Sequence, residues 1–162
     1  MIRIARIDDV ARIREIARAA YARYVPRIGR EPAPMVTDYD ADVRARRVVV
    51  LEDECNVIGY LVAWPEDDAY FIENIGIEPQ LHGKGWGRRL MDHAVSEAVR
   101  LGLPALRLYT NAAMTENLAM YAHLGFIETH RVTENGLNRV YLRLNLAERQ
   151  VYPDQPPRRG RE

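Results

Sequence analysis

The stretch that decides the fold is IEPQLHGKGWGRRLMDHA, residues 77–94. It places Gly83, Gly85 and Gly87 within five positions, directly before a run with the apolar spacing of a helix. Glycine is costly in ordered structure and is used where φ must be positive or where another group approaches the backbone closely. The stretch therefore predicts either a tight strand-to-helix turn or an anion site at the start of a helix.

The composition indicates one globular domain without a charge bias. The chain has 162 residues, 48% hydrophobic and 28% charged, with 23 basic and 23 acidic residues. That length favours a single domain with a real core. A net charge of zero gives no overall attraction to nucleic acid or to a membrane surface, so we expect neither as a partner.

Cysteine usage and hydropathy set further expectations. Cys55 is the single cysteine, so no disulfide can form within the chain, and no Cys/His spacing suggests zinc. We expect no metal. No apolar run reaches the roughly 20 residues of a membrane span, and the first residues, MIRIARIDDVARI, do not resemble a signal peptide. A cytoplasmic location is the resulting expectation.

Periodicity predicts about seven strands and about four helices in the order β-α-α-β-β-β-α-β-α-β-β. Asp38 or Thr37 is predicted to cap the second helix, and the Asn135–Gly136 pair predicts a hairpin turn. We expect an α/β (α+β) domain over residues 1–147, with helices on both faces of a mixed, mostly antiparallel sheet. Residues 148–162 are predicted to be a disordered tail. The predicted strands are 2–6, 47–52, 57–64, 70–77, 105–110, 126–132 and 138–146, and the helices are 10–24, 37–45, 85–101 and 115–124.

Three kinds of phosphate-binding loop compete for the glycines. A Walker loop needs Lys-Ser or Lys-Thr after its last glycine, but Trp86 follows Gly85. A Rossmann loop has the spacing G-x-G-x-x-G and follows the first strand, whereas this one is G-x-G-x-G after four strands. The third pattern, Gln80-x-x-Gly83-x-Gly85, resembles the acyl-CoA loop of the GNAT family of N-acetyltransferases.

Three other stretches carry the same resemblance, which covers roughly residues 2–146. NIGIEP is similar to the family's fourth strand, and IRIARIDDVARIREIARAAY to its first strand and helix. LRLYTNAAMTENLAMYAHLGF resembles the fifth strand and the next helix, with Tyr121, Gly125 and Phe126 in a Y-x-x-x-G-F pattern. The resemblance implies transfer of an acetyl group from acetyl-CoA to a primary amine of a small molecule or peptide, by direct attack on the thioester.

The loop also has a physical reason to bind a pyrophosphate. The first N–H groups of a helix have no partner within it, and the helix dipole adds partial positive charge there. By resemblance, the strand before the loop pairs with pantetheine, and one of its N–H groups can hold the thioester oxygen. The predicted acetyl-CoA contacts are Ile75, Gly76, Ile77, Gln80, His82, Gly83, Lys84, Gly85, Trp86, Gly87, Arg88, Asn111, Asn117 and Tyr121.

Two side chains are candidates for proton transfer. Tyr121 matches the family tyrosine that donates a proton to the departing thiolate or hydrogen-bonds the sulfur; a packed aromatic residue is the alternative. Glu73 precedes Ile75 by two residues, so strict alternation puts both on one face of the strand, where the carboxylate can act as a base. A solvent-facing or salt-bridged glutamate explains Glu73 equally well.

The sequence departs from the family pattern at two positions. Many relatives carry a CoA-contacting Asn seven residues before the tyrosine, where this chain has Met114. Some relatives carry a Glu on the fifth strand, where this chain has Tyr109, which argues against a ribosomal-protein N-terminal acetylase with that base.

The acceptor amine is expected between the first two helices and the last hairpin. Tyr21, Arg27, Tyr39 and Arg139 are the predicted contacts, although a surface charge cluster explains the charged residues of this region equally well. Two rival classes remain open, a non-catalytic acyl-CoA-binding or regulatory module and a nucleotide-binding module. The family resemblance also makes a homodimer possible.

Overall fold

The chain folds around one mixed sheet of seven strands in the order β1-β2-β3-β4-β5-β7-β6. The computed structural model describes residues 1–146, and the predicted tail 148–162 lies outside them. Among the strands of residues 1–146 only β4 and β5 pair in parallel, so the predicted mostly antiparallel sheet is confirmed. The strands are β1 (Ile2–Ile4), β2 (Val48–Asp53), β3 (Asn56–Glu66), β4 (Ala69–Ile77), β5 (Ala105–Asn111), β6 (Ile127–Glu134) and β7 (Leu137–Asn145).

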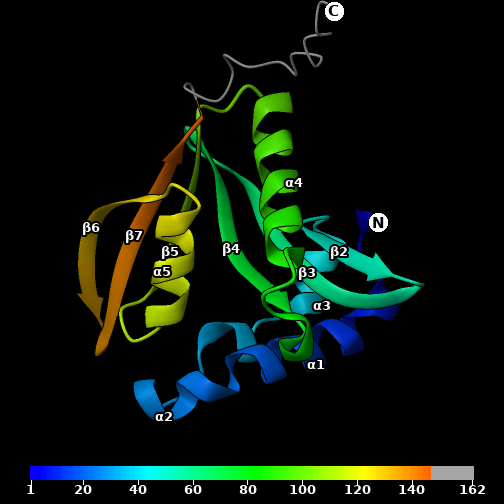
Figure 1. Ribbon diagram of the computed structural model, residues 1–162, viewed down its shortest axis with the longest axis horizontal. Helices are drawn as coiled ribbons and strands as arrows, with labels where there is room; N and C mark the ends of the chain where they lie inside the picture. Colours follow the sequence, from blue (N-terminus) through cyan, green and yellow to red (C-terminus); the bar gives the residue numbers. More distant parts are fainter. Residues whose placement is uncertain (147–162) are drawn as a thin grey trace, which may run out of the picture.

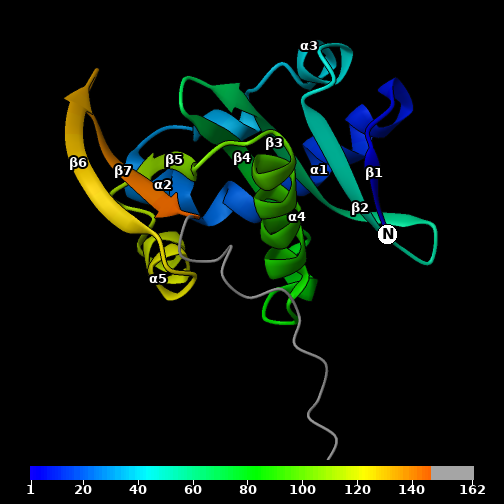
Figure 2. The same ribbon diagram turned by 90° about the horizontal axis from the view of Figure 1, so that it is seen from above.

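The helices cover both faces of this sheet. Figure 2 shows α4 and α5 on one side and α1 and α3 on the other, so the core forms two layers. No helix within residues 1–146 is long and apolar enough to cross a membrane. The helices are α1 (Val10–Tyr21), α2 (Val25–Ile28), α3 (Tyr39–Arg44), α4 (Trp86–Arg100) and α5 (Thr115–His123).

Local signals in the sequence account for several boundaries. The Asp38 carboxylate accepts the Ala41 N–H at 3.1 Å, which confirms the predicted cap of α3. Asn135 and Gly136 both have positive φ, 50° and 74°, as the tight turn between β6 and β7 requires. The short helix α2 lies between the predicted helices 10–24 and 37–45, where no element was predicted, because Pro26 is tolerated in the first turn of a helix.

The sheet divides between β4 and β5. The two strands pair from Tyr70–Leu106 to Ile72–Leu108 and no further. Directly after the last pair, β4 contains a bulge, because Ala63 of β3 pairs with Ile72 and Val62 with Asn74, which leaves Glu73 without a partner in β3. An extra residue bends a strand and increases its twist. Beyond Ile72, β4 therefore turns away from β5 (Figure 1).

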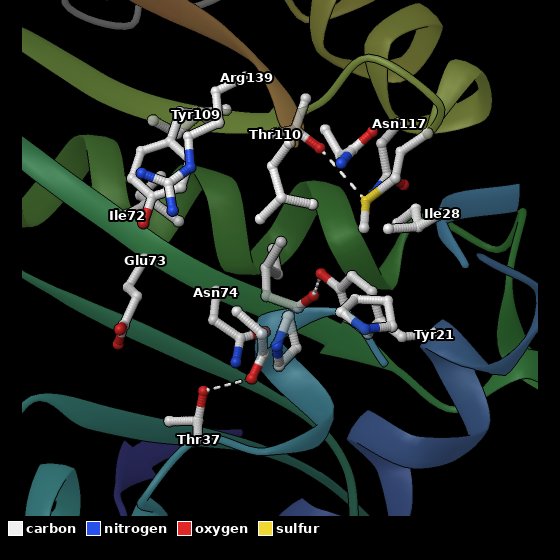
Figure 3. A pocket seen from close by; sticks show the side chains of 18 of the residues that line it. Tyr21, Ile28, Thr37, Ile72, Glu73, Asn74, Tyr109, Thr110, Asn117 and Arg139 are labelled. Carbon is white, nitrogen blue, oxygen red and sulfur yellow. Dashed lines mark hydrogen bonds between the residues drawn. The ribbon is translucent and has the colours of Figure 1, made fainter. Parts of the chain in front are cut away.

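The bulge also changes which face each side chain of β4 occupies. Ile72 and Ile75 both lie in the core layer under α4, which strict alternation would forbid. Glu73 leaves β4 on the same side as Asn74 (Figure 3). The prediction that Glu73 shares a face with Ile75 is wrong, because the extra residue interrupts the alternation between them.

One glycine of β4 is fixed by packing. Gly76 lies opposite Tyr60 of β3, and a Cβ on Gly76 would lie 2.4 Å from the Tyr60 ring. Tyr60 is fully buried, so its ring has no free space to move into.

We predict that Gly76→Ala lowers the free energy of unfolding by about 1–3 kcal/mol, because the buried Tyr60 ring must shift. Urea denaturation measures the change. Gly87→Ala is the matched control, since the nearest atom to its Cβ would be Ile77 Cγ1 at 4.0 Å, and the added methyl should be neutral or stabilise by up to about 1 kcal/mol. Equal losses in the two variants would contradict the packing argument.

Candidate functional site

Two cavities meet where β4 and β5 part. The first, which we call the loop cavity, encloses about 550 Å³ between the glycine loop, the start of α4, the end of α1 and α5. The second, the sheet cavity, encloses about 130 Å³ between residues 30–37 and the strands β4, β5 and β7. Four residues line both cavities, which makes their junction the place where two ligands can meet: Tyr21, Ile75, Asn117 and Tyr121.

The glycine loop leaves the first turn of α4 open toward the loop cavity. Gly83 and Gly85 have φ of +77° and +86°, a conformation that side chains with a Cβ rarely adopt. Gly85 is the N-cap and has no side chain to accept the first N–H groups of α4. The loop cavity is lined there by Gly83, Gly85, Trp86, Gly87 and Arg88. The unpaired N–H groups of the first turn of α4, the helix dipole and the Arg88 cation together suit the binding of an anion.

The free edge of β4 supplies a second set of backbone donors. Tyr21 donates its hydroxyl to the Ile75 carbonyl at 2.8 Å, and the Ile77 carbonyl lies 2.8 Å from His82 Nε2. Both carbonyls therefore point away from β3, whereas the Glu78 N–H is donated to Ile58 of β3. Because N–H and C=O of one strand residue point to the same side, the N–H groups of Ile75 and Ile77 also face the gap. An amide-rich chain can pair with this edge.

Tyr121 lies at the junction with its hydroxyl available. Its ring is buried and packs edge-on against Phe126 with 5.5 Å between centroids. Within residues 1–146 the hydroxyl has no hydrogen-bond partner. Burial raises the pKa of Tyr121, and the neighbouring Tyr24 raises it further. The phenol is therefore protonated at neutral pH and can donate a proton.

Glu73 brings a carboxylate into the sheet cavity. Its Oε2 is buried and has no hydrogen-bond partner among residues 1–146. Burial raises the pKa of Glu73, Asp42 raises it further, and Arg47 opposes both. A half-buried carboxylate with one buried oxygen unpaired is unfavourable, so an arriving ammonium group would relieve it.

The structure places some of the other predicted acetyl-CoA contacts at the cavities and others away from them. Asn117 lines both cavities, and its Oδ1 lies 3.4 Å from the Tyr24 hydroxyl. Gln80 and Lys84 are exposed and line neither cavity. Asn111 lines the sheet cavity, not the loop cavity, and its Oδ1 accepts the Ala113 N–H at 2.8 Å because it closes the turn after β5.

Of the four predicted acceptor contacts, two line the sheet cavity and two do not. Tyr21 and Arg139 line the sheet cavity, and the Arg139 guanidinium lies 4.8 Å from the centre of the Tyr109 ring. Arg27 lines neither cavity, because it is held by a two-bond ion pair to Glu116. Tyr39 is 1% exposed and lies in the core between α3 and the sheet, which corrects the expectation that it touches the acceptor.

Sequence reasoning missed other residues that line the sheet cavity. Asn74 is the clearest, since it and Glu73 are adjacent polar side chains within a mostly apolar strand and that pattern was available. Thr37 and Tyr109 also line this cavity, but their positions depend on how distant segments pack. Within the described residues, no three His, Cys, Asp or Glu side chains gather as a metal site would require.

Comparison with known proteins agrees with this geometry. The family model described as "Acetyltransferase (GNAT) family" matches residues 10–126, so the chain belongs to the GNAT acetyltransferase family. It is 30% identical over 106 residues to "Peptidyl-lysine N-acetyltransferase YjaB" of Salmonella typhimurium, a match covering 65% of this chain and 63% of that protein. It is 34% identical over 55 residues to "[Ribosomal protein bS18]-alanine N-acetyltransferase" of Escherichia coli K12, covering 34% and 37%.

The chain thus spans less than two thirds of the length of these curated relatives. Among solved structures, it is similar to the PaiA N-acetyltransferase from Thermoplasma acidophilum in complex with coenzyme A, with a TM-score of 0.72 and 15% identity. That match covers 90% of this chain and 98% of the other. The structural likeness establishes the shared fold.

We predict that Gly87→Ala weakens binding of coenzyme A by about ten-fold or more, although it leaves the fold intact. Gly87 lines the loop cavity, and outside its own turn of α4 the nearest protein atom to its Cβ would be Ile77 Cγ1 at 4.0 Å, so we expect the methyl to occupy space in the cavity. Isothermal titration calorimetry with coenzyme A measures the affinity. An unchanged Kd would mean that the ligand does not approach the start of α4.

Proposed function

We propose that the chain transfers the acetyl group of acetyl-CoA to a primary amine of a small molecule or peptide, by direct attack of the amine on the thioester. The observation that carries this proposal is the junction of the two cavities, where Tyr121 and the backbone of Ile75 line both. One cavity suits an anionic, amide-rich cosubstrate, and the other is lined by Glu73, whose Oε2 has no hydrogen-bond partner among residues 1–146.

The loop cavity supports acetyl-CoA as the cosubstrate. The open first turn of α4 and Arg88 suit the pyrophosphate, and the N–H groups of Ile75 and Ile77 suit the amides of pantetheine. One of these β4 donors would also stabilise the thioester oxygen as negative charge develops on it. The similar PaiA N-acetyltransferase was solved in complex with coenzyme A, and membership in the GNAT family points the same way.

The sheet cavity supports the amine as the second substrate. Glu73 would accept the proton of the ammonium group, directly or through a water, which frees the nitrogen lone pair. The nitrogen then forms a bond to the acetyl carbon, the carbon–sulfur bond breaks, and the nitrogen releases its second proton to solvent, from which Tyr121 regains the proton it gives up. Tyr121 would supply the proton that the departing thiolate takes up, or at least a hydrogen bond to the sulfur.

A panel of candidate amines tests which chemical class of acceptor the protein acetylates. The curated relatives are named for the amines of peptidyl-lysine and of an alanine in a ribosomal protein, which supports including peptides with free lysine or free N-terminus. The protein is incubated with acetyl-CoA and each of these peptides, amino acids, polyamines and aminoglycosides, and thiol release is measured. Release with at least one amine is expected. Binding of coenzyme A without release would favour a non-catalytic acyl-CoA-binding module.

We predict that Tyr121→Phe lowers kcat by roughly 100-fold with the best amine of the panel, since a positioned general acid contributes about 10²–10⁴. The Kd for coenzyme A should stay within about two-fold, because the ring and its packing against Phe126 remain. Tyr70→Phe is the control, as Tyr70 packs in the core layer under α4 and lines neither cavity. An unchanged kcat in Tyr121→Phe would remove the acid role.

We predict that Glu73→Gln removes the acidic limb of the pH profile of kcat/KM. In the wild type the rate should rise as pH passes through the raised pKa of Glu73, because only the ionised carboxylate can accept a proton. The variant should lose roughly 100-fold in rate at neutral pH and show no such limb. Glu66→Gln, whose carboxylate pairs with Arg107 outside both cavities, is the control. Superimposable profiles for wild type and Glu73→Gln would exclude Glu73 as the base.

A further inference from the structure

Three buried polar side chains lie close together between α3 and the sheet, next to Glu73. They have no part in the proposed chemistry. Tyr39, Tyr60 and Asn74 are 1%, 0% and 4% exposed. Burial of a polar group is unfavourable unless it is hydrogen-bonded, and a buried network is most favourable when every member is satisfied.

The hydrogen bonds of the network run in one direction. The Tyr60 hydroxyl donates to Asn74 Oδ1 at 2.8 Å, and Asn74 Nδ2 donates to the Tyr39 hydroxyl at 2.6 Å. Tyr39 in turn donates to the carbonyl of Pro34 at 2.5 Å. Each hydroxyl has one proton to give, so turning the amide of Asn74 around would make Tyr39 donate to Asn74 and leave the Pro34 carbonyl without its donor. The network therefore ends on the backbone of residue 34.

Pro34 belongs to the segment 29–37, which we call the strap. The strap forms one wall of the sheet cavity, opposite the strands that carry Glu73 and Tyr109. Inside it, Thr37 Oγ1 donates to the Ala33 carbonyl at 2.8 Å (Figure 3). The residues of the strap that line the cavity are Arg30, Glu31, Pro32, Ala33, Pro34 and Thr37.

The strap is tied down at two places. Near its start, Arg30 Nη2 donates to the Asn135 carbonyl at 2.6 Å, in the turn between β6 and β7. Near its end, the Pro34 carbonyl is held by Tyr39, which is bonded to Asn74. Asn74 directly follows Glu73 in the bulge and itself lines the cavity. The second tie thus joins the strap to the residue next to the candidate base.

We propose that Tyr39 and Asn74 are positioning residues that hold the strap at a fixed separation from the Glu73 carboxylate and so place the acceptor amine against it. This inference rests on the proposed function. Tyr39 touches no substrate; it acts through the Pro34 carbonyl on one side and Asn74 on the other. Its hydroxyl links two walls of the sheet cavity that come from distant parts of the sequence.

The test uses Tyr39→Phe in the full chain, which keeps the ring and removes the link. Hydrogen exchange followed by mass spectrometry should show at least about ten-fold faster exchange in the strap, where the Met35 and Val36 N–H groups are bonded within the segment. With the best amine of the panel, the KM for the amine should rise about ten-fold, and the KM for acetyl-CoA should stay within about two-fold.

Two further variants keep the test independent of a general loss of stability. Arg30→Gln removes the other tie at an exposed position and should change strap exchange and amine KM in the same direction. Tyr70→Phe removes a phenol hydroxyl from the opposite core layer and should change neither. Urea denaturation of each variant confirms that it is folded under the assay conditions.

Two results would overturn the positioning role while leaving the proposed function intact. In one, strap exchange in Tyr39→Phe equals that of the wild type. In the other, the strap exchanges faster but the amine KM is unchanged, or both KM values rise together. If the wild type releases no coenzyme A with any amine, the proposed function itself fails and the positioning role fails with it, whatever the strap does.

Discussion

One extra residue in β4 governs the arrangement of the site. Glu73 has no partner in β3, and the bend that this bulge introduces coincides with the last pair between β4 and β5. Beyond that point the β4 edge is free, and the N–H groups of Ile75 and Ile77 face a cavity instead of a neighbouring strand. The same bulge turns the Glu73 carboxylate to the opposite face, into the second cavity. Without the bulge, the free edge of β4 would not face one cavity while the Glu73 carboxylate enters the other.

Glycine serves two separate needs around this strand. At position 76 a Cβ would collide with the buried Tyr60 ring, so the absence of a side chain serves packing. At position 87 a Cβ would meet no close protein atom, so the absence leaves space at the start of α4. The positive φ of Gly83 and Gly85 serves the turn itself. In the glycine cluster before α4, Gly83 and Gly85 thus allow the turn, and Gly87 leaves space for a ligand.

Much of the fold could be predicted because its signals are local. The order of strands and helices, the Asp38 cap and the Asn135–Gly136 turn all follow from periodicity and short-range chemistry. The bulge could not be predicted from the sequence, because AYFIENIGI is buried on both faces of the sheet. Its apolar pattern therefore does not show where the alternation of side chains is interrupted. The glycine loop, Ile75 and Tyr121 were found through a motif, and the structure brings them together at the cavities.

Errors in the predicted site arose where the partner of a charged or polar group lies far away in the sequence. Arg27 is held by Glu116, and Tyr39 bonds to Pro34 and Asn74, so neither side chain is directed at the acceptor. Asn111 is used by its own turn. Such pairings follow from how α2, α3 and α5 pack, which a single sequence does not specify.

The most direct test of the cosubstrate edge is residue-resolved amide hydrogen exchange of β4 by NMR, with and without saturating acetyl-CoA. We predict that the Ile75 and Ile77 amides exchange readily in the free protein and become protected when acetyl-CoA binds. The Gly76 amide, which faces β3, should be protected in both states. Ile75 and Ile77 amides that are already protected in the free protein, or that acetyl-CoA leaves unchanged, would contradict the claim that the free edge of β4 holds the cosubstrate.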